Sequence, residues 1–411
     1  MVSRLPFLFI ITGILGFVGF HMASLLSLSQ WLAEELRGPS GWFHVHFFVL
    51  GWATMLAMGA IYQLIHVILQ RNIYSEKLGY VHYVLFTVGL VGVLYGFYNG
   101  EIYWIAISAT LLMISVLVFA INMAITLYQA KIWNTITLSA ACAIFYLVLT
   151  AVSGLIMGLN LALGYWVDLH ARLYGAHIWL GTVGWFGLLI TGFSYKMLPM
   201  FYLSHHYPEK LQKVTLALWN GAVIAGVLCF LLGATTSMLQ LALGILTAAI
   251  IVYNIHLLQI RKHRYKRKPG AGIQWSMYFN HAFALAAAIA LVYSLIKPEQ
   301  LLSADSVRLL IWLYLGGWVS FMILSYASKI IPFLWWTYKY GKQAGKPGTP
   351  VMSDLLDDRY VRISLAVLAV SSAIMIVGLL SDTKLLISLF GILFSLCSFH
   401  YIALISSVFR R

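Results

Sequence analysis

The chain has 411 residues, of which 62% are hydrophobic and only 9% are charged, and its formal net charge is +14. A soluble globular domain carries about 25% charged residues, so this composition excludes a soluble protein and indicates an integral membrane protein. The positive charge does not indicate a nucleic-acid partner, because the basic residues lie in short loops and at helix ends, where they signal membrane topology.

Twelve segments are long and apolar enough to cross a membrane, which takes about 20 residues in a helix. In chain order, we predict spans at residues 5–30, 42–69, 79–99, 102–129, 135–162, 170–200, 211–234, 237–260, 273–296, 307–337, 360–380 and 384–409. The run after Arg4 has no clear small-residue cleavage site, so we interpret it as a retained first span rather than a signal peptide. We therefore predict an all-α polytopic membrane protein with a single transmembrane domain over residues 1–411.

The loops differ in charge between the two sides of these spans. One side carries basic loops such as QRNIYSEK (residues 70–77) and RKHRYKRK (residues 261–268), whereas the other carries AEELRGPSG (residues 33–41) and NGE (residues 99–101). Cytoplasmic loops are enriched in Lys and Arg. We therefore predict a multi-pass protein of the cytoplasmic membrane, with the lipid bilayer as its surroundings and both termini in the cytoplasm.

A Gly-Trp pair recurs at a constant spacing in the second, sixth and tenth spans. The pairs begin at Gly51, Gly184 and Gly317, so the two steps between them (184 − 51 and 317 − 184) are equal. The same offset relates further positions along these spans, and it predicts three four-helix units around a pseudo-threefold axis. These units cover approximately residues 1–130, 131–262 and 263–411.

The repeat also relates residues that could bind a cofactor. Its offset aligns His44 with His177, and the third equivalent position is Leu310. It also aligns Trp52 with Trp185, whose indoles could fill the space between helices or form the wall of a site for a planar cofactor. The repeat therefore makes His44 and His177 the best pair of candidate ligands.

Twelve spans in three groups of four, with a histidine at the outer end of the second and sixth spans, resemble subunit I of the haem-copper oxidases. This superfamily contains the cytochrome c oxidases and the nitric oxide reductases, and the stretch GAHIWLGTVGWFGLLITGFSYKMLP (residues 175–199) is similar to its divergent single-subunit members. The chain also looks like the haem- and copper-containing membrane proteins of the nitric-oxide stress response. The resemblance implies one or two haems, with copper as a further candidate. It places an axial ligand of a low-spin haem at His44 or His46, and a ligand of copper or non-haem iron at His177.

The chain departs from this family at several ligand positions. The family's His-Pro-Glu-Val-Tyr pattern is absent, since Ile178 and Trp179 follow His177. The seventh span, where the family carries adjacent histidines, contains none, and the tenth span lacks the family's His-x-His pair. The resemblance therefore implies an incomplete metal site, without the usual three-histidine centre or bis-histidine haem.

Several histidines fall in the outer half of the membrane, where an imidazole needs a hydrogen-bonding or metal partner. The candidate cofactor-binding residues are His21, His44, His46, His170 and His177, together with Trp52 and Trp185. Neutral imidazole is a common ligand of iron and copper, so this group favours ligation over the alternative of hydrogen-bonded histidines between helices. His44 and His46 point about 200° apart on a helix, so His46 is the substitute for His44 and not its companion. His170 and His177 share one face.

His281 in the ninth span is either an isolated contact between helices or a ligand of another site. The candidate metal ligands are thus His44, His177 and His281. The other histidines lie at cytoplasmic ends or loops, and we interpret them as interfacial: His66, His82, His205, His206, His256, His263 and His400. We expect Lys196 and Lys329 to extend their side chains to the membrane interface.

None of the twelve acidic residues lies in the middle of a span, which argues against a proton pump and against a proton-coupled carrier. We predict a haem-binding membrane redox protein that transfers electrons, or binds or reduces O2 or NO, with a cytochrome or a quinol as candidate electron donor. An enzyme of this kind would be an oxidoreductase of the cytochrome c oxidase and nitric oxide reductase type, but the sequence does not decide whether the chain is an enzyme. The alternative is a non-enzymatic haem or copper carrier, sensor or oxidase assembly factor on the same scaffold.

Overall fold

The computed structural model describes residues 3–34, 36–233 and 235–411. Within these ranges the chain forms helices and connecting loops with no β-strand, and twelve helices are long and apolar enough to cross a membrane. The twelve spans are Leu5–Leu26, Pro39–Leu69, Glu76–Asn99, Ile102–Ala130, Thr135–Leu163, Val167–Tyr202, Lys210–Leu231, Thr236–Lys262, Ala271–Ile296, Ala304–Gln343, Asp358–Leu380 and Lys384–Arg410. The prediction of an all-helical polytopic membrane protein is confirmed.

The second, sixth and tenth spans each begin three residues earlier than hydrophobicity predicts. Their first turns contain Pro39, Asp168 and Asp305. Proline suits the first turn of a helix because it has no N–H to leave unpaired, and a carboxylate there interacts favourably with the positive end of the helix dipole. Polar residues thus extend these helices beyond their apolar segments.

The chain divides into two compact units. Unit 1 consists of Met1–Leu64, Lys268–Asn280 and Arg308–Arg411, and unit 2 consists of Ile65–Arg267 and His281–Val307. Three helices contribute to both units: α3 (Met55–Leu69), α11 (Ala271–Ile296) and α12 (Ala304–Ile311). The division into three four-helix units therefore remains a prediction.

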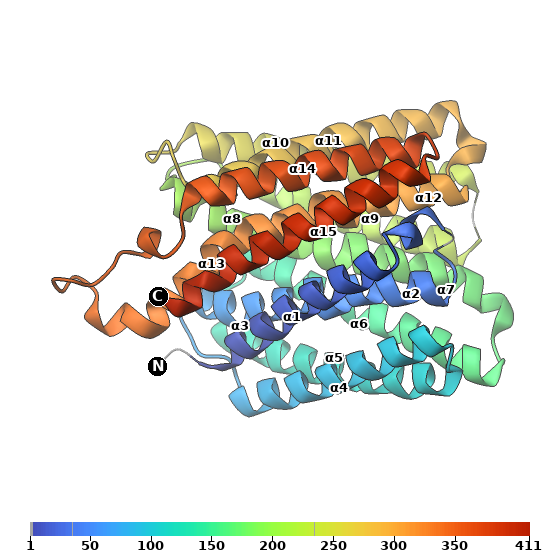
Figure 1. Cartoon of the computed structure of the whole chain (residues 1–411), viewed down its shortest axis with the longest axis horizontal. Helices are drawn as coiled ribbons and strands as arrows, with labels where there is room; N and C mark the ends of the chain where they lie inside the picture. Colours follow the sequence, from blue (N-terminus) through green and yellow to red (C-terminus); the bar gives the residue numbers. More distant parts are fainter. Residues whose placement is uncertain (1–2, 35, 234) are drawn as a thin grey trace. The chain divides into compact units, whose positions relative to one another are not determined.

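Unit 1 contains helices from both ends of the chain. Besides its parts of the three shared helices, it contains α1 (Leu5–Leu26), α2 (Pro39–His46), η2 (Phe47–Thr54), η5 (Trp312–Val319), α13 (Ser320–Tyr340), α14 (Asp358–Leu380) and α15 (Lys384–Ser406). The helix α1 packs against η2 and α15, and α14 and α15 lie side by side (Figure 1). The start of α1 and the end of α15 lie at the same end of the unit, where the rings of Phe7 and Phe409 are 6.4 Å apart.

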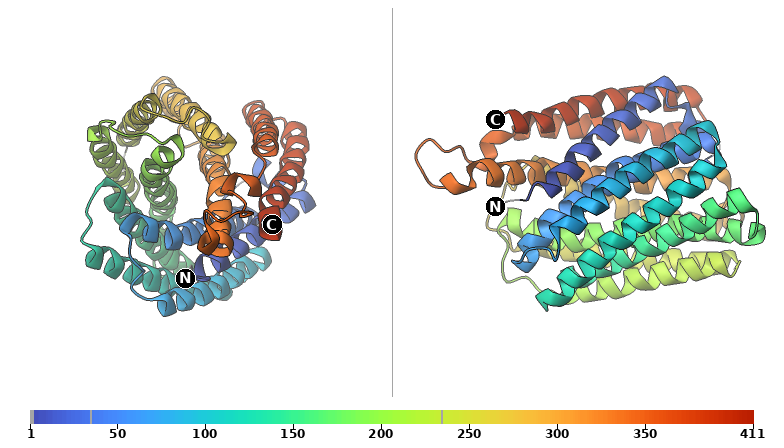
Figure 2. Two further views of the ribbon diagram at one scale, coloured as in Figure 1. Left: turned by 90° about the vertical axis from the view of Figure 1, so that its left-hand side faces the viewer. Right: turned by 90° about the horizontal axis from the view of Figure 1, so that it is seen from below.

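Unit 2 contains the helices from the third to the eighth span. They are α4 (Glu76–Asn99), α5 (Ile102–Ala130), α6 (Thr135–Leu163), α7 (Val167–Trp179), η3 (Leu180–Gly187), α8 (Leu188–Tyr202), α9 (Lys210–Leu231) and α10 (Thr236–Lys262). The helices α4, α5 and α6 run alongside one another in chain order (Figure 2). Side-chain caps start α4 and α6: the Ser75 hydroxyl accepts from the Leu78 N–H, and the Asn134 side chain accepts from the Ile136 and Thr137 N–H groups.

Three short stretches are wound as π-helix, in which the hydrogen bonds join residues five positions apart. These stretches, η2, η3 and η5, each have eight residues and each contain one of the Gly-Trp pairs. Their first residues, Phe47, Leu180 and Trp312, follow the offset of the Gly-Trp repeat to within one position (180 − 47 and 312 − 180). The π-turn is rare and is frequent at functional sites, so its recurrence distinguishes the second, sixth and tenth spans from the other nine among the described residues.

A close contact between two helices recurs with the same offset. In each case an added Cβ on a glycine would press on the neighbouring helix. The pairs are Gly59 with the Pro6 carbonyl oxygen at 3.1 Å, Gly192 with the Ser139 Cβ at 2.6 Å, and Gly272 with the Ser325 carbonyl oxygen. Positions 6, 139 and 272 are related by the repeat offset, and so are positions 59, 192 and 325. This contact is independent of the Gly-Trp pairs and supports the threefold repeat.

Lys329 pairs with Asp358, the first residue of the eleventh span, and its expected extension to the membrane interface remains a prediction. Its Nζ atom lies 2.8 Å from Oδ1 of Asp358, and its side chain is only 15% exposed. The space around the ammonium is kept open by Gly270, whose φ of +110° suits glycine and whose missing Cβ would overlap Nζ. The Asp358 carboxylate thus stabilises the Lys329 ammonium in place of water.

Candidate functional site

His44 lies on α2 and is buried, with 6% of its surface exposed. Its Nδ1 atom is 2.8 Å from the carbonyl oxygen of Ser40, and its ring is stacked on Trp31 at 4.9 Å with an interplanar angle of 3°. The ring also interacts with the Ala23 backbone, which is a weaker hydrogen-bonding contact than that to Ser40, and no atom of the described residues lies in full hydrogen-bond geometry to Nε2. A buried nitrogen without a partner needs a physical explanation, and an absent ligand is one.

His21 on α1 has a similar environment. It is 1% exposed, its Nδ1 atom is 3.0 Å from the hydroxyl oxygen of Ser395, and Nε2 meets no hydrogen-bond partner in the part of the chain that the structure describes. Aromatic rings surround it, with Phe17 at 4.4 Å and Phe20 at 5.0 Å. Both His21 and His44 belong to unit 1, so one unit contains two buried imidazoles with an unsatisfied nitrogen.

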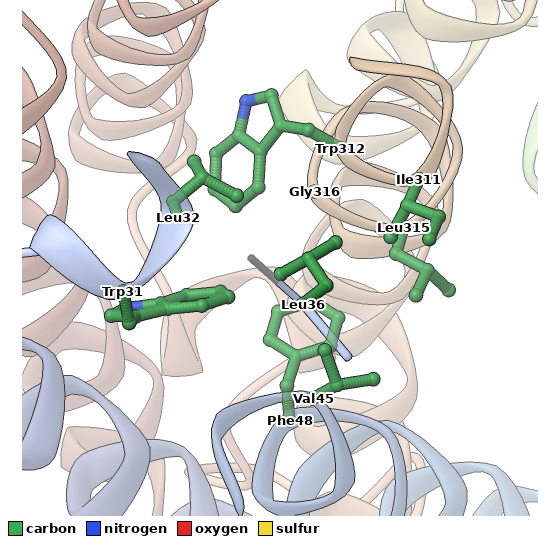
Figure 3. A pocket seen from close by; sticks show the side chains of 9 residues that line it. All are labelled: Trp31, Leu32, Leu36, Val45, Phe48, Ile311, Trp312, Leu315 and Gly316. Carbon is green, nitrogen blue, oxygen red and sulfur yellow. The ribbon is translucent and has the colours of Figure 1, made fainter. Parts of the chain in front are cut away.

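An apolar pocket lies beside these histidines in unit 1. It is lined by Trp31, Leu32, Leu36, Val45, Phe48, Ile311, Trp312, Leu315 and Gly316. Figure 3 shows Trp31 and Leu32 from the short helix η1 (Gln30–Ala33) facing Trp312 and Leu315 from η5 across the empty space. The enclosed volume is about 20 Å³, which is room for a molecule of about the size of water. The pocket as it stands is therefore too small for a tetrapyrrole.

Trp52 and Trp185 are both fully buried, in unit 1 and unit 2 respectively. The Trp52 ring packs against Phe17 at 4.3 Å and Phe48 at 4.9 Å. The tryptophan predicted in unit 1 thus fills space between α1 and η2, which is the first of the two roles that the sequence suggested.

In unit 2, His177 and His170 lie on one face of α7, as the seven-residue spacing predicts, and both meet α6. The Nδ1 atom of His177 is 3.0 Å from the carbonyl oxygen of Thr150 and 3.1 Å from the hydroxyl of Ser153. The Nδ1 atom of His170 is 3.3 Å from the side-chain nitrogen of Asn160. These bonds tie both rings to the neighbouring helix.

His46 and His281 also have one ring nitrogen bound to an oxygen. Nδ1 of His46 is 2.8 Å from the Trp42 carbonyl, and Nδ1 of His281 is 2.9 Å from Oδ1 of Asn254. The bonds of His44 and His46 reach the carbonyl four residues earlier, and His263 makes the same local bond to Gln259 at 2.9 Å. Such a bond is therefore common in this chain, and what distinguishes His44 from His46 and His263 is its buried, unsatisfied Nε2.

Two histidines predicted at the membrane interface are instead fully buried in the protein. His82 stacks on Phe119 at 4.9 Å, and Nε2 of His256 is 3.1 Å from the side-chain nitrogen of Gln212. Nearby in the loop before α9, burial raises the pKa of Tyr207 to about 12, with a further contribution from the charge of Glu209. The interpretation of these two histidines as interfacial, from their positions near the cytoplasmic ends of spans, was wrong because helix packing covers them.

The described residues contain no group of three His, Cys, Asp or Glu side chains that could hold a metal ion. His44, His177 and His281, the candidate metal ligands, are divided between the two units. The residues present therefore do not fit a three-ligand copper or non-haem iron site, whereas a buried imidazole with an unsatisfied nitrogen, such as that of His44, would supply one ligand to a haem iron.

Sequence reasoning did not identify the residues that contact these histidines. Trp31 and Ser395 belong to segments without a recognisable motif. Arg308 donates a hydrogen bond to Ala33, in the segment of Trp31, and is 275 residues away from Ala33 in sequence. The one sequence feature that could have indicated these contacts is the tryptophan in the loop LSQWLAEELRGPSG between the first two spans.

A family model described as "Cytochrome C and Quinol oxidase polypeptide I" matches residues 2–254, which is more than half of the chain. The matched residues contain His21, His44, His46, His170 and His177, whereas His281 and the last four spans lie outside them. No curated protein matches the chain. With twelve helices of membrane-spanning length in its described part and this match, the chain belongs to the cytochrome c and quinol oxidase subunit I family.

Proposed function

We propose that this chain binds one haem in unit 1 with His44 as the protein ligand of the iron, and that it transfers electrons or binds a diatomic gas. The observation that carries this proposal is the buried Nε2 of His44, which has no hydrogen-bond partner among the described residues. An unsatisfied buried nitrogen costs about 1–3 kcal/mol, and coordination of an iron would remove that cost.

The hydrogen bond of the other ring nitrogen sets the tautomer of His44. The Ser40 carbonyl can only accept a hydrogen bond, so Nδ1 carries the proton and Nε2 carries the lone pair. This is the arrangement of metal-binding histidines, whose second nitrogen is held by a backbone carbonyl or a carboxylate. The parallel Trp31 ring restricts rotation of the imidazole about its side-chain bonds. His44 is thus prepared as a ligand by its own helix and by η1.

The tenth span supplies no second ligand to this site. Leu310 stands at the position equivalent to His44 and His177, and Trp312 and Leu315 line the pocket instead. A haem with one histidine ligand supplies an iron with an open position, at which a diatomic gas can bind. Trp31 covers one face of His44, and Phe20 packs against both Trp31 and Phe48, so aromatic side chains would exclude water from such a site.

A second candidate function is a non-enzymatic haem or copper carrier, sensor or assembly factor. The specific observation in its favour is that the described residues provide no three-ligand metal group beside the haem ligand. Reduction of O2 or NO by this family requires a second metal next to the haem, so gas binding or electron transfer fits these residues better than catalysis. A cytochrome or a quinol is the electron donor that we propose for a redox role.

A carbon monoxide difference spectrum of the reduced, purified protein tests this function. A haem with a single histidine ligand binds CO and shifts its Soret band, whereas a haem with two protein ligands does not respond. We expect a CO-induced shift in the wild-type protein. A haem protein whose spectrum is unchanged by CO would contradict the open position.

We also propose that both termini and the basic loops face the cytoplasm in the cytoplasmic membrane, by the positive-inside rule. Lys266 and Glu299 are both exposed, on loops of opposite predicted sides. In a variant without the three native cysteines, Lys266→Cys should react with a membrane-impermeant maleimide only in inverted vesicles, and Glu299→Cys only in right-side-out vesicles. The reverse pattern would overturn this orientation.

A further inference from the structure

We propose that residues 27–34 form a lid over His44 in unit 1 and that Arg308 is its latch, so that Arg308 controls access of the ligand to His44. This proposal rests on the proposed function in one respect, which is that haem is the ligand that the lid admits.

The lid begins with a sharp reversal of the chain after α1. Leu28 and Ser29 have φ angles of 48° and 57°, and the Ser29 N–H donates to the Ser24 carbonyl at 2.7 Å. Two consecutive non-glycine residues in the left-handed region are unusual, and surrounding contacts must enforce them. The reversal turns the short helix η1 back onto unit 1, where Trp31, Leu32 and Ala33 are buried.

The inner surface of the lid forms the outer wall of the site. The Trp31 ring covers one face of His44, and its Nε1 donates to the Ser24 hydroxyl at 3.3 Å. Trp31 and Leu32 also line the apolar pocket, opposite Trp312 (Figure 3). Movement of the lid would therefore add the volume of two large side chains to a pocket that is now too small for a tetrapyrrole, and it would uncover the His44 ring.

Arg308 holds the lid from the tenth span. Its guanidinium donates to the Ala33 carbonyl at 2.6 Å, which is a short, charge-assisted hydrogen bond. The lid is a single short helical turn with no strand or long helix of its own, so its position depends on such contacts and on the packing of η1 against α2 and α15. Segments held in this way open at a lower free energy than the helices around them. Arg308 is thus a positioning residue that acts on His44 through Ala33 and Trp31.

Cysteine accessibility measures lid opening without reference to haem. Leu32 is 1% exposed, so Leu32→Cys, in a variant without the native cysteines, should react slowly with a maleimide in the purified full-length protein. Adding Arg308→Ala should raise this rate about tenfold, because the charge-assisted hydrogen bond to the Ala33 carbonyl is lost. Arg308→Lys keeps a charged donor and should give an intermediate rate. If Arg308→Ala does not fold, as judged by size-exclusion chromatography, the comparison of Arg308→Lys with Arg308→Gln provides the same test.

Arg172 provides the matched control, since it is an arginine on α7 that donates to the Leu231 carbonyl at 3.5 Å in unit 2. Arg172→Ala should leave the rate at Leu32→Cys unchanged. In parallel, transfer of haem from the purified protein to apomyoglobin should be about tenfold faster for Arg308→Ala than for the wild type. An unchanged rate of modification in Arg308→Ala would refute the latch whatever the haem content. A faster rate in a protein that never contains haem would keep the lid and refute the proposed function.

Discussion

His44→Ala is expected to remove the Soret band of the purified protein and most of its haem iron. The chain offers one buried imidazole in the second span whose Nδ1 proton is bound by a carbonyl and whose Nε2 lone pair has no partner within the described residues. Alanine removes that lone pair and leaves an apolar cavity in front of Trp31. No histidine of the tenth span can replace it, because that span contains none. Absorbance spectra and iron analysis of the purified variant measure the effect.

His263→Ala is the matched control for this substitution. His263 makes the same bond to the carbonyl four residues earlier, but it follows the last residue of α10 in unit 2 and is outside the proposed site. Its replacement should leave the Soret band intact, and imidazole added to His44→Ala should restore part of the band by occupying the cavity. If His44→Ala keeps its full haem content while remaining folded, His44 is not the ligand.

Gly16→Leu is expected to abolish the folding of unit 1. A Cβ atom at Gly16 would overlap the carbonyl group of Gly51, which is part of the π-helix η2. Both partners are backbone, so neither can move aside as a flexible side chain would. Overpacking usually costs about 1–3 kcal/mol, and we expect a backbone clash to exceed this range. The loss of folded protein is measured by heating the detergent-solubilised protein and monitoring the remaining folded fraction by size-exclusion chromatography.

Gly244→Leu separates this clash from a general effect of adding a leucine. No atom outside the local helix lies within 4 Å of a Cβ built at Gly244, which is a helical position on α10. The substitution should therefore change the free energy of unfolding by no more than about 1 kcal/mol. Equal destabilisation by both substitutions would contradict the importance of the contact between α1 and η2.

Hydrophobicity predicted the twelve spans because membrane-spanning length and apolarity are local properties. Their ends were less accurate where polar first turns continue the helix, as at Asp168 and Asp305. The three π-helices were not predicted, since a hydrophobic run is compatible with either winding. The offset of the Gly-Trp repeat indicated which spans correspond, and the contacts at Gly59, Gly192 and Gly272 recur with that offset.

The candidate site was predictable only in part. The repeat and the family resemblance singled out His44 and His177 as the best pair among thirteen histidines, but they said nothing of Trp31 or Arg308, whose contacts depend on tertiary structure. The partner of Lys329 was not predicted for the same reason, because Asp358 lies on another span. A position near the cytoplasmic end of a span likewise misassigned His82 and His256, which neighbouring helices bury.

The metal and haem content of protein purified from its native membrane tests the proposed site most directly. With His44 as the single ligand, and with no three-ligand metal group in the described part of the chain, we predict one haem iron per chain and no stoichiometric copper. A colourless protein that does not take up added haem would contradict the proposal. Two haems with one copper would equally contradict it, because that content requires the complete ligand set of the oxidases.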